Sequence, residues 1–160
     1  LVIVSSRKQE LCDEVAAEVI CDGYHVHPAM CRVAIAAKGA TRVMAITDGT
    51  AVSGLPVGAS ARLGGRPIHA GDGAAFLEDG TLAGSTLTMD AAFRNVVHLF
   101  GRSFVEAAAL CSTTAARELG LTGLGLIAAG ATADVVVLDR ALKVTRTFVA
   151  GEQVYPSGQI

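Results

Sequence analysis

The 160-residue sequence has no tryptophan, few other aromatic residues and no strong excess of charge of either sign. Aromatic residues account for 4% of the chain, and the formal net charge is −2. Basic side chains form no stripe along the chain, which argues against a protein that binds nucleic acid through the phosphate backbone. The sequence contains no run of about eighteen apolar residues, so we expect no membrane-spanning helix.

Cysteine is also scarce, and the cysteines are not arranged in pairs. The chain has four of them, Cys12, Cys21, Cys31 and Cys111, and none belongs to a C-x-x-C motif. The sequence also shows no secretory signal. We therefore expect reduced thiols that fill the core of a cytoplasmic protein.

Small and aliphatic residues are abundant. Hydrophobic residues make up 51% of the sequence, and 18 residues are glycine. Together with plentiful Ala and Val, this composition is typical of tightly packed α/β layers and not of disorder. A chain of this length suits one domain or a piece of a larger one. Because its first residue is Leu1 and not methionine, we expect a fragment.

The first half of the chain alternates strand and helix patterns. Residues 15–21 and 42–50 are apolar runs typical of strands, and residues 28–39 between them predict a helix that begins with proline and ends with glycine. Strand, helix and strand with short links predict a βαβ unit of a parallel sheet. Catalytic and ligand-binding residues of such sheets lie at the C-terminal ends of the strands. We therefore expect His25 and Asp48 to belong to one site.

The rest of the chain predicts hairpins, two helices and a late set of strands. Residues 51–80 are rich in Gly and Pro and indicate one or two hairpins. Residues 86–100 predict an amphipathic helix, and Ser103 is expected to cap the next helix, which closes at Gly120. From Gly125 onward, β-rich segments predict the strands of a separate small sheet.

Two histidines stand two residues apart in the segment CDGYHVHP. His25 and His27 would share one face if this segment were a strand. A metal site needs three or four ligands, and the other histidines, His69 and His98, fall in a hairpin region and on a helix. We therefore expect a site role for His25 and a structural hydrogen bond for His27 beside Pro28.

Three further segments have both a structural and a functional interpretation. Asp48 ends an apolar strand, where it either makes a turn before Gly49 or, as we favour, serves as a general acid and base helped by partial burial. The Asp22-Gly23 pair is either a plain turn or a close approach of backbone to a ligand. The segment LAGSTLTM, residues 82–89, offers N–H groups and hydroxyls to a polar ligand, caps the following helix, or does both.

Several motifs, taken in order, resemble a known family. DGYHVHP, ITDGT, GTLAGSTLTM and, later, TADVVVLD followed by RTFVAGEQV resemble the C-terminal half of the N-acetylglucosamine-6-phosphate deacetylases of the amidohydrolase superfamily. The resemblance implies an α/β fold: the C-terminal part of a metal-dependent (β/α)8 TIM barrel plus strands of a small β-sandwich. Residues 1–124 would be the barrel portion, with its last two strands, a hairpin insertion and helices, and residues 125–160 the sandwich strands. Residues 1–14 do not resemble the family's sixth-strand region.

The resemblance also implies roles for individual residues. Asp48 matches the catalytic aspartate, which takes a proton from the water that the metal activates and returns it to the leaving amine. His25 matches the histidine that hydrogen-bonds to the acetamide carbonyl and polarises it. The other substrate-binding residues would be Asp22, Gly23, Tyr24, Leu82, Ala83 and Gly84.

The family hydrolyses the acetamide of N-acetylglucosamine 6-phosphate to glucosamine 6-phosphate and acetate with a divalent metal, such as zinc or iron. Its metal ligands, one Glu and two His, lie on earlier strands, so we expect no metal ligand in this chain and no activity from the chain alone. The whole protein is expected to be a cytoplasmic homodimer that acts on a small amino-sugar phosphate. The alternatives are another amidohydrolase, such as a cyclic amidase or a deaminase, and a non-catalytic half barrel that binds a sugar or a partner.

Overall fold

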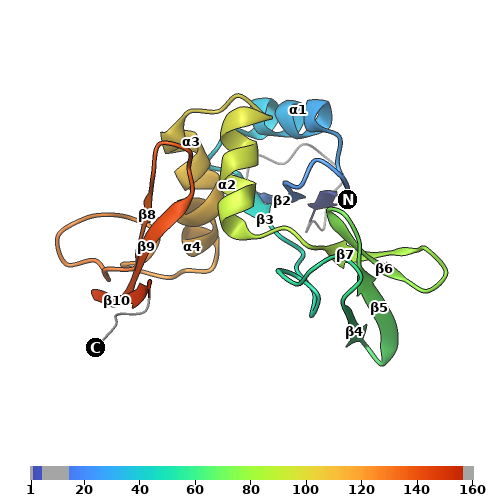
Figure 1. Cartoon of the computed structure of the whole chain (residues 1–160). Coiled ribbons are helices and arrows are strands. Elements are labelled where there is room, and N and C mark those ends of the chain that lie inside the picture. The colour runs from blue at the N-terminus through green and yellow to red at the C-terminus, as the bar shows by residue number, and fades with distance from the viewer. Residues whose placement is uncertain (1, 5–14, 157–160) are drawn as a thin grey trace.

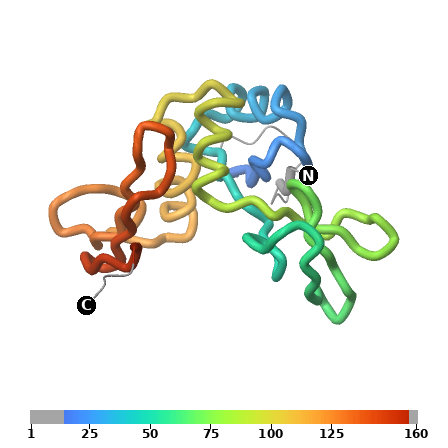
Figure 2. Tube along the Cα trace, viewed as in Figure 1, coloured from blue at the N-terminus to red at the C-terminus, as the bar shows by residue number. Residues whose placement is uncertain are grey.

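A computed structural model describes residues 2–4 and 15–156 of the chain as a central α/β body with a β-rich lobe on either side (Figure 1). The three parts carry one sheet each, and the described strands pair within these sheets, apart from one isolated bridge. The tube in Figure 2 follows the chain from the body into the hairpin lobe, back through the helices of the body and out into the C-terminal lobe.

The central sheet joins three strands in the order β1 (Val2–Val4), β2 (Ala17–Ile20) and β3 (Val43–Ile46). β2 and β3 run parallel, and helix α1 (Pro28–Lys38) connects them, which confirms the predicted βαβ unit. β1, near the start of the chain, pairs antiparallel with β2. The polar segment after it, residues 5–14, lies outside the described residues.

Helices cover the central sheet and enclose the main core. α2 (Met89–His98), α3 (Phe104–Ala108), a π-helical segment η1 (Ala109–Thr113) and α4 (Thr114–Glu118) follow one another along the chain, and α2, η1 and α4 contact β3. The main core is a cluster of buried apolar side chains from the helices and the sheet. Burial of one large apolar side chain stabilises the fold by about 1.5–3 kcal/mol, so this cluster holds the helices against the sheet. Its members include Val19, Cys21, Cys31, Ile35, Val43, Val96, Phe100 and Leu110.

The cysteines of the described residues are core residues, as predicted. Cys21 and Cys31 are buried, Cys111 is partly buried, and all three are free thiols. Burial raises the pKa of the Cys21 thiol, and it raises that of Cys111 to about 11. These thiols are therefore neutral fillers at physiological pH. Cys12 lies outside the described residues.

The helix boundaries follow the predicted signals closely. Ser103 caps α3: the N–H of Glu106 donates to its Oγ, and the Glu106 carboxylate accepts from the Ser103 N–H over 2.9 Å, which is a capping box. The helical segment that begins there ends with Leu119 as C-cap and Gly120 at φ +68°. Among the described residues, no helix has both the length and the apolar character needed to cross a membrane.

The hairpin lobe is a four-stranded antiparallel sheet. Its strands, in sheet order, are β4 (Ser60–Leu63), β5 (Arg66–Ala70), β6 (Ala74–Leu77) and β7 (Leu82–Ser85). The predicted hairpins are confirmed, and the last strand, β7, lies in the segment 82–89 that precedes a helix. The lobe has its own small core, made of Val52, Ile68, Ala70, Ala75 and Leu77.

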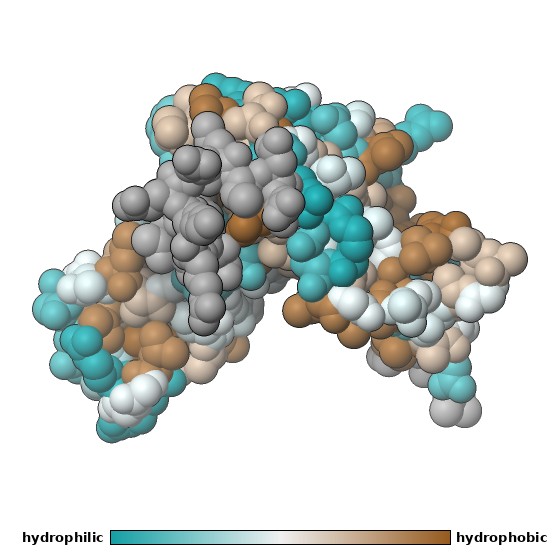
Figure 3. All heavy atoms as spheres, turned by 180° about the vertical axis from the view of Figure 1, so that it is seen from behind, coloured by the Kyte–Doolittle hydropathy of each residue, from teal (hydrophilic) through white to brown (hydrophobic). Residues whose placement is uncertain are grey.

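The C-terminal lobe is the separate late sheet that the sequence predicts. β8 (Val135–Leu138), β9 (Val144–Val149) and β10 (Glu152–Tyr155) are antiparallel in the order β10-β9-β8. Seen from behind, hydrophobic residues lie on the surface of both lobes (Figure 3). In the C-terminal lobe the exposed large hydrophobic residues are Leu126, Ile127, Val136, Val137, Val149, Val154 and Tyr155.

Candidate functional site

The segment after β2 is a tight turn built on the carboxylate of Asp22. Its Oδ1 accepts hydrogen bonds from the N–H of Tyr24 over 2.8 Å and from the N–H of His25 over 2.9 Å, which is the geometry of an Asx turn. Gly23 lies inside this turn at φ +75°, a conformation that other residues rarely adopt. The turn interpretation of the Asp-Gly pair is therefore confirmed, and the turn sets the position of His25.

His25 and His27 do not lie on a strand, so the condition under which they would share one face is not met. β2 ends at Ile20, and both histidines follow in the turn. His27 is the N-cap of α1, where its Nδ1 accepts from the N–H of Ala29 over 3.2 Å. The structural role predicted for His27 is confirmed, while His25 is held by a different partner.

His25 forms a close pair with Asp22, and Ser85 joins the same carboxylate oxygen. Nδ1 of His25 lies 2.6 Å from Oδ2 of Asp22, and the side chains are 8% and 3% exposed, respectively. Oγ of Ser85 donates to Oδ2 over 2.8 Å. Burial raises the pKa of the Asp22 carboxyl, but the hydrogen bonds from His25, Tyr24 and Ser85 outweigh burial and hold that pKa below its ordinary value of 3.8. Asp22 is therefore ionised at neutral pH.

Ser85 is fully buried near the end of β7 and connects this pair to the segment after β3. Its N–H donates to the carbonyl oxygen of Asp48 over 2.9 Å, and Gly49 forms a parallel bridge with it. Its carbonyl oxygen accepts from Oγ of Ser53 over 2.9 Å, and its Oγ accepts from the N–H of Leu87 over 3.1 Å. Through Ser85, the turn after β2 and the loop after β3 meet at one strand.

The carboxylate of Asp48 lies on the surface, so the partial burial expected for it is wrong. β3 ends at Ile46, and Asp48 follows in the loop at φ +48°. Asn and Asp are the non-glycine residues most often found in this left-handed region. The backbone of Gly84 packs against this loop: a Cβ at Gly84 would stand 2.9 Å from the Asp48 carbonyl oxygen and 2.6 Å from Cγ2 of Thr50.

The remaining predicted site residues lie at the margins of this arrangement. Tyr24 is exposed, and its ring meets the rings of His25 and Phe76 edge-on at centroid distances of 6.0 and 6.2 Å. Leu82 is exposed at the start of β7, and Ala83 packs on the core of the hairpin lobe. Of the segment 82–84, the structure therefore brings only Gly84 against the Asp48 loop.

Ser85 was not among the predicted site residues, although it lies within the segment LAGSTLTM, which was interpreted as a helix cap or a ligand-binding segment. Thr88 is the N-cap of α2, but its side chain accepts no capping hydrogen bond. The available signal was the serine hydroxyl itself, because a buried hydroxyl needs a partner. Here that partner is Asp22.

The described residues do not offer a complete metal site. No group of three or more His, Cys, Asp or Glu side chains within residues 2–4 and 15–156 is placed to hold a metal ion. The Asp22 carboxylate is already engaged by its hydrogen-bond donors. A divalent metal therefore does not fit the side chains described in this chain.

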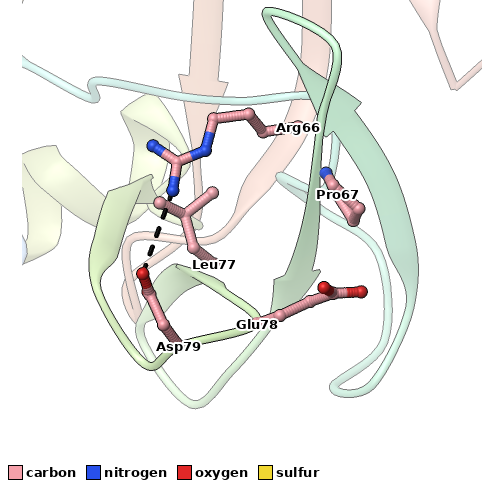
Figure 4. A pocket seen from close by; sticks show the side chains of 5 residues that line it. All are labelled: Arg66, Pro67, Leu77, Glu78 and Asp79. Carbon is pink, nitrogen blue, oxygen red and sulfur yellow. Dashed lines mark ion pairs between the residues drawn. The ribbon is translucent and has the colours of Figure 1, made fainter.

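Two surface hollows have linings that include none of the predicted site residues. One, of about 190 Å³, lies on the hairpin lobe, where Arg66 and Asp79 form an exposed ion pair at 3.9 Å (Figure 4). The other, of about 690 Å³, lies between α2, η1 and the C-terminal lobe. The candidate site is thus the Ser85-centred junction and neither hollow.

Comparison with known proteins places this geometry in a family. The model of the amidohydrolase family matches residues 7–154. An N-acetylglucosamine-6-phosphate deacetylase of Lysinibacillus sphaericus is 38% identical over 141 residues, which are 88% of this chain and 36% of that protein. A putative N-acetylgalactosamine-6-phosphate deacetylase of Escherichia coli K12 is 41% identical over 137 residues, 84% of this chain and 80% of that protein.

A solved structure agrees with these relatives. The crystal structure of N-acetylglucosamine-6-phosphate deacetylase from Thermotoga maritima superimposes with a TM-score of 0.84 at 39% sequence identity, over 91% of this chain and 40% of that one. The chain thus spans little more than a third of the L. sphaericus relative and two fifths of the T. maritima structure. On these matches, the chain belongs to the amidohydrolase family.

Proposed function

We propose that the chain is the C-terminal part of a deacetylase that hydrolyses the acetamide of N-acetylglucosamine 6-phosphate to glucosamine 6-phosphate and acetate. One observation carries the proposal: Ser85 links the His25–Asp22 pair, after β2, to Asp48, after β3. These loops follow parallel neighbours in a sheet, where α/β enzymes hold their reactive groups. The names of the relatives supply the substrate class.

Asp48 is proposed to act on the water and the leaving amine, and His25 on the carbonyl oxygen. Water adds to the acetamide carbon, the C–N bond breaks, and the amine needs a proton to leave. The exposed carboxylate of Asp48 takes the proton from the attacking water and returns it to the amine. His25 meets the carbonyl oxygen, where negative charge develops. Gly23, Tyr24 and Gly84 are proposed to line the sugar site beside them.

The architecture proposed for the whole protein follows from the same strands. β2 and β3 would be the last two strands of a (β/α)8 barrel within residues 1–124, and residues 125–160 would contribute strands to a β-sandwich. Two parallel strands cannot close an eight-stranded barrel. β1 pairs antiparallel with β2, whereas barrel neighbours are parallel, so it does not serve as the sixth barrel strand.

The remaining requirements are also assigned to the whole protein. A divalent metal, such as zinc or iron, would be held by one Glu and two His outside this chain, and it would supply an activated water at neutral pH. We propose a cytoplasmic homodimer. A cyclic amidase, a deaminase and a non-catalytic half barrel remain the competing functions.

A second substrate is favoured by a specific observation. The E. coli K12 relative, at 41% identity, carries the name of an N-acetylgalactosamine-6-phosphate deacetylase. The two sugars differ in the configuration of one hydroxyl, at C4, while the acetamide and the phosphate are the same. The galactosamine epimer is therefore the second candidate substrate.

A substrate panel on the whole protein tests the proposal. The purified metal-loaded protein is assayed for acetate release from both epimers and for turnover of a cyclic amide and an aminopurine nucleoside. We expect acetate release from at least one epimer, its loss when a chelator removes the metal, and its return with added metal. Turnover of the cyclic amide or the nucleoside, without acetate release from either sugar, would indicate another amidohydrolase activity. Sugar binding without any turnover would favour the half-barrel function.

A further inference from the structure

We propose that Asp22 is a positioning residue that does not contact substrate: with Ser85, it holds His25 so that Nδ1–H points at the carboxylate and Nε2 alone faces the ligand. The inference rests on the proposed function and deepens it. It replaces the substrate-binding role that the resemblance implied for Asp22, and it adds Ser85 to the site.

The carboxylate of Asp22 has no acceptor position left. An ionised carboxylate offers roughly four lone-pair directions and no donor. Oδ1 receives the N–H groups of Tyr24 and His25, and Oδ2 receives Nδ1 of His25 and Oγ of Ser85. The side chain is also 3% exposed. A sugar hydroxyl would have to displace one of these four donors.

A proton lies between Oδ2 of Asp22 and Nδ1 of His25. The two atoms are 2.6 Å apart, which requires a hydrogen between them, and the ionised carboxylate supplies none. The hydrogen therefore sits on Nδ1 of His25. In the neutral ring Nε2 then carries a lone pair, and only the imidazolium form donates from Nε2 to a carbonyl oxygen. Asp22 thus fixes which ring nitrogen faces the carboxylate and leaves Nε2 for the ligand.

The hydrogen bonds of Ser85 fix the orientation of its hydroxyl. Its Oγ accepts from the N–H of Leu87 over 3.1 Å, so one lone pair is occupied. Its hydrogen can go to Asp22 at 2.8 Å or to the carbonyl oxygen of Gly73 at 3.4 Å, and the shorter contact to a charged acceptor is stronger. Because the N–H of Ser85 also holds the Asp48 loop, one buried residue sets the positions of both proposed reacting groups.

Histidine ring ¹⁵N NMR tests the proton placement without any need for activity. In the whole protein labelled at histidine, ring correlations show which nitrogen carries hydrogen, and the His25→Gln variant identifies the His25 signals. We expect Nδ1 of His25 to be protonated in the wild type. In Asp22→Asn, the side-chain amide can donate to Nδ1, so the signals should move to the Nε2–H tautomer. Asp79→Asn is the matched control, because Asp79 also accepts a turn N–H, from Thr81, at the far end of the hairpin lobe.

Steady-state kinetics on the whole protein test the role. Loss of a group that orients another lowers kcat, whereas loss of a ground-state substrate contact raises KM. We expect Asp22→Asn to lower kcat by about 10- to 100-fold with KM changed less than about threefold, and Ser85→Ala to act in the same direction with a smaller effect. A raised KM at unchanged kcat would overturn the inference.

The two experiments separate the inference from the proposed function. A whole protein that releases no acetate defeats the deacetylase proposal, while the NMR spectrum still decides the state of His25. A wild-type spectrum with unprotonated Nδ1 defeats the inference, even if the protein is an active deacetylase. If Asp22→Asn does not fold, the wild-type spectrum together with Ser85→Ala decides the outcome.

Discussion

The N–H of Ser85 donates to the carbonyl oxygen of Asp48 over 2.9 Å, and this bond brings the backbone of the preceding residue, Gly84, against the loop after β3. Gly84 has φ +109°, and a Cβ there would lie 2.6 Å from Cγ2 of Thr50. A real Cβ does not tolerate such a contact, so the strand and the loop can meet only at a glycine.

The first prediction follows from this contact. Gly84→Ala should destabilise the chain by both the strained backbone and the crowding, about 2–4 kcal/mol in the free energy of unfolding, and should displace the Asp48 loop. Gly80→Ala is the matched control: it lies in the same lobe at φ +80°, but its Cβ would meet nothing within 4 Å. Its cost should be limited to the backbone, about 1–2 kcal/mol. Urea unfolding measures both, and equal costs would contradict the close approach at Gly84.

The second prediction concerns Asp48 itself. Asp48→Asn removes the carboxylate but suits the left-handed backbone at φ +48°, and the residue is exposed. We expect a change in unfolding free energy within about 0.5 kcal/mol. Acetate release by the whole protein should fall by about 10²- to 10⁴-fold, the usual contribution of a general acid and base. Glu152→Gln, an exposed carboxylate in β10, is the control, and equal activities of the two variants would exclude Asp48 from the chemistry.

The sequence predicted those parts of the fold that depend on local signals. Alternating apolar runs, with Pro28 and Gly39 bounding a helix, located the βαβ unit, and Ser103 located the start of α3. Each of these helix ends is set by residues close to it in the chain, so a single sequence is enough to locate it. The bounds of β7 do not follow from local signals, because LAGS has little strand propensity of its own and pairs with β6 through its backbone.

The candidate site was predictable by segment but not by contact. The sequence pointed to Asp22, His25 and Asp48, yet the partner that joins them, Ser85, is 63 residues away from Asp22 along the chain. Such a pairing depends on the tertiary fold and leaves no periodic trace. The burial of Asp48 was predicted wrongly for a related reason: the apolar run continues toward residue 50, but the pairing of β3 stops at Ile46, which only the fold shows.

The third prediction concerns stability at acid pH. The pKa of Asp22 lies below its ordinary value of 3.8 in the folded chain, so its contribution to stability is complete above that value and is lost as the pH falls through the lowered folded pKa. The difference in unfolding free energy between wild type and Asp22→Asn should therefore be largest at neutral pH and shrink below about pH 4. Urea unfolding across this range measures it, and a difference independent of pH would contradict the charged network.

The fourth prediction separates two helix starts. Ser103 accepts the N–H of Glu106 and completes a capping box, whereas the side chain of Thr88, the N-cap of α2, makes no capping bond. Ser103→Ala should lower the free energy of unfolding by about 1 kcal/mol, and Thr88→Ala by less. Chemical unfolding of the two variants side by side provides the measurement. An equal loss in both would show that the capping box contributes nothing.

The fifth prediction concerns the exposed hydrophobic surface of the chain on its own. Ile127 is 91% exposed and Val136 is 55% exposed, and both line the hollow of about 690 Å³ between the helices and the C-terminal lobe. A monomeric soluble protein rarely leaves a large apolar patch uncovered, so the isolated chain should self-associate as its concentration rises. Ile127→Asp and Val136→Asp should reduce this association in sedimentation velocity. Val57→Asp is the control, because Val57 is 72% exposed but outside the lining of this hollow. A single monomer boundary at every concentration, together with a cooperative melt, would contradict this prediction. The isolated chain would then fold as a monomer with this apolar patch exposed to water, without a partner segment from a longer protein.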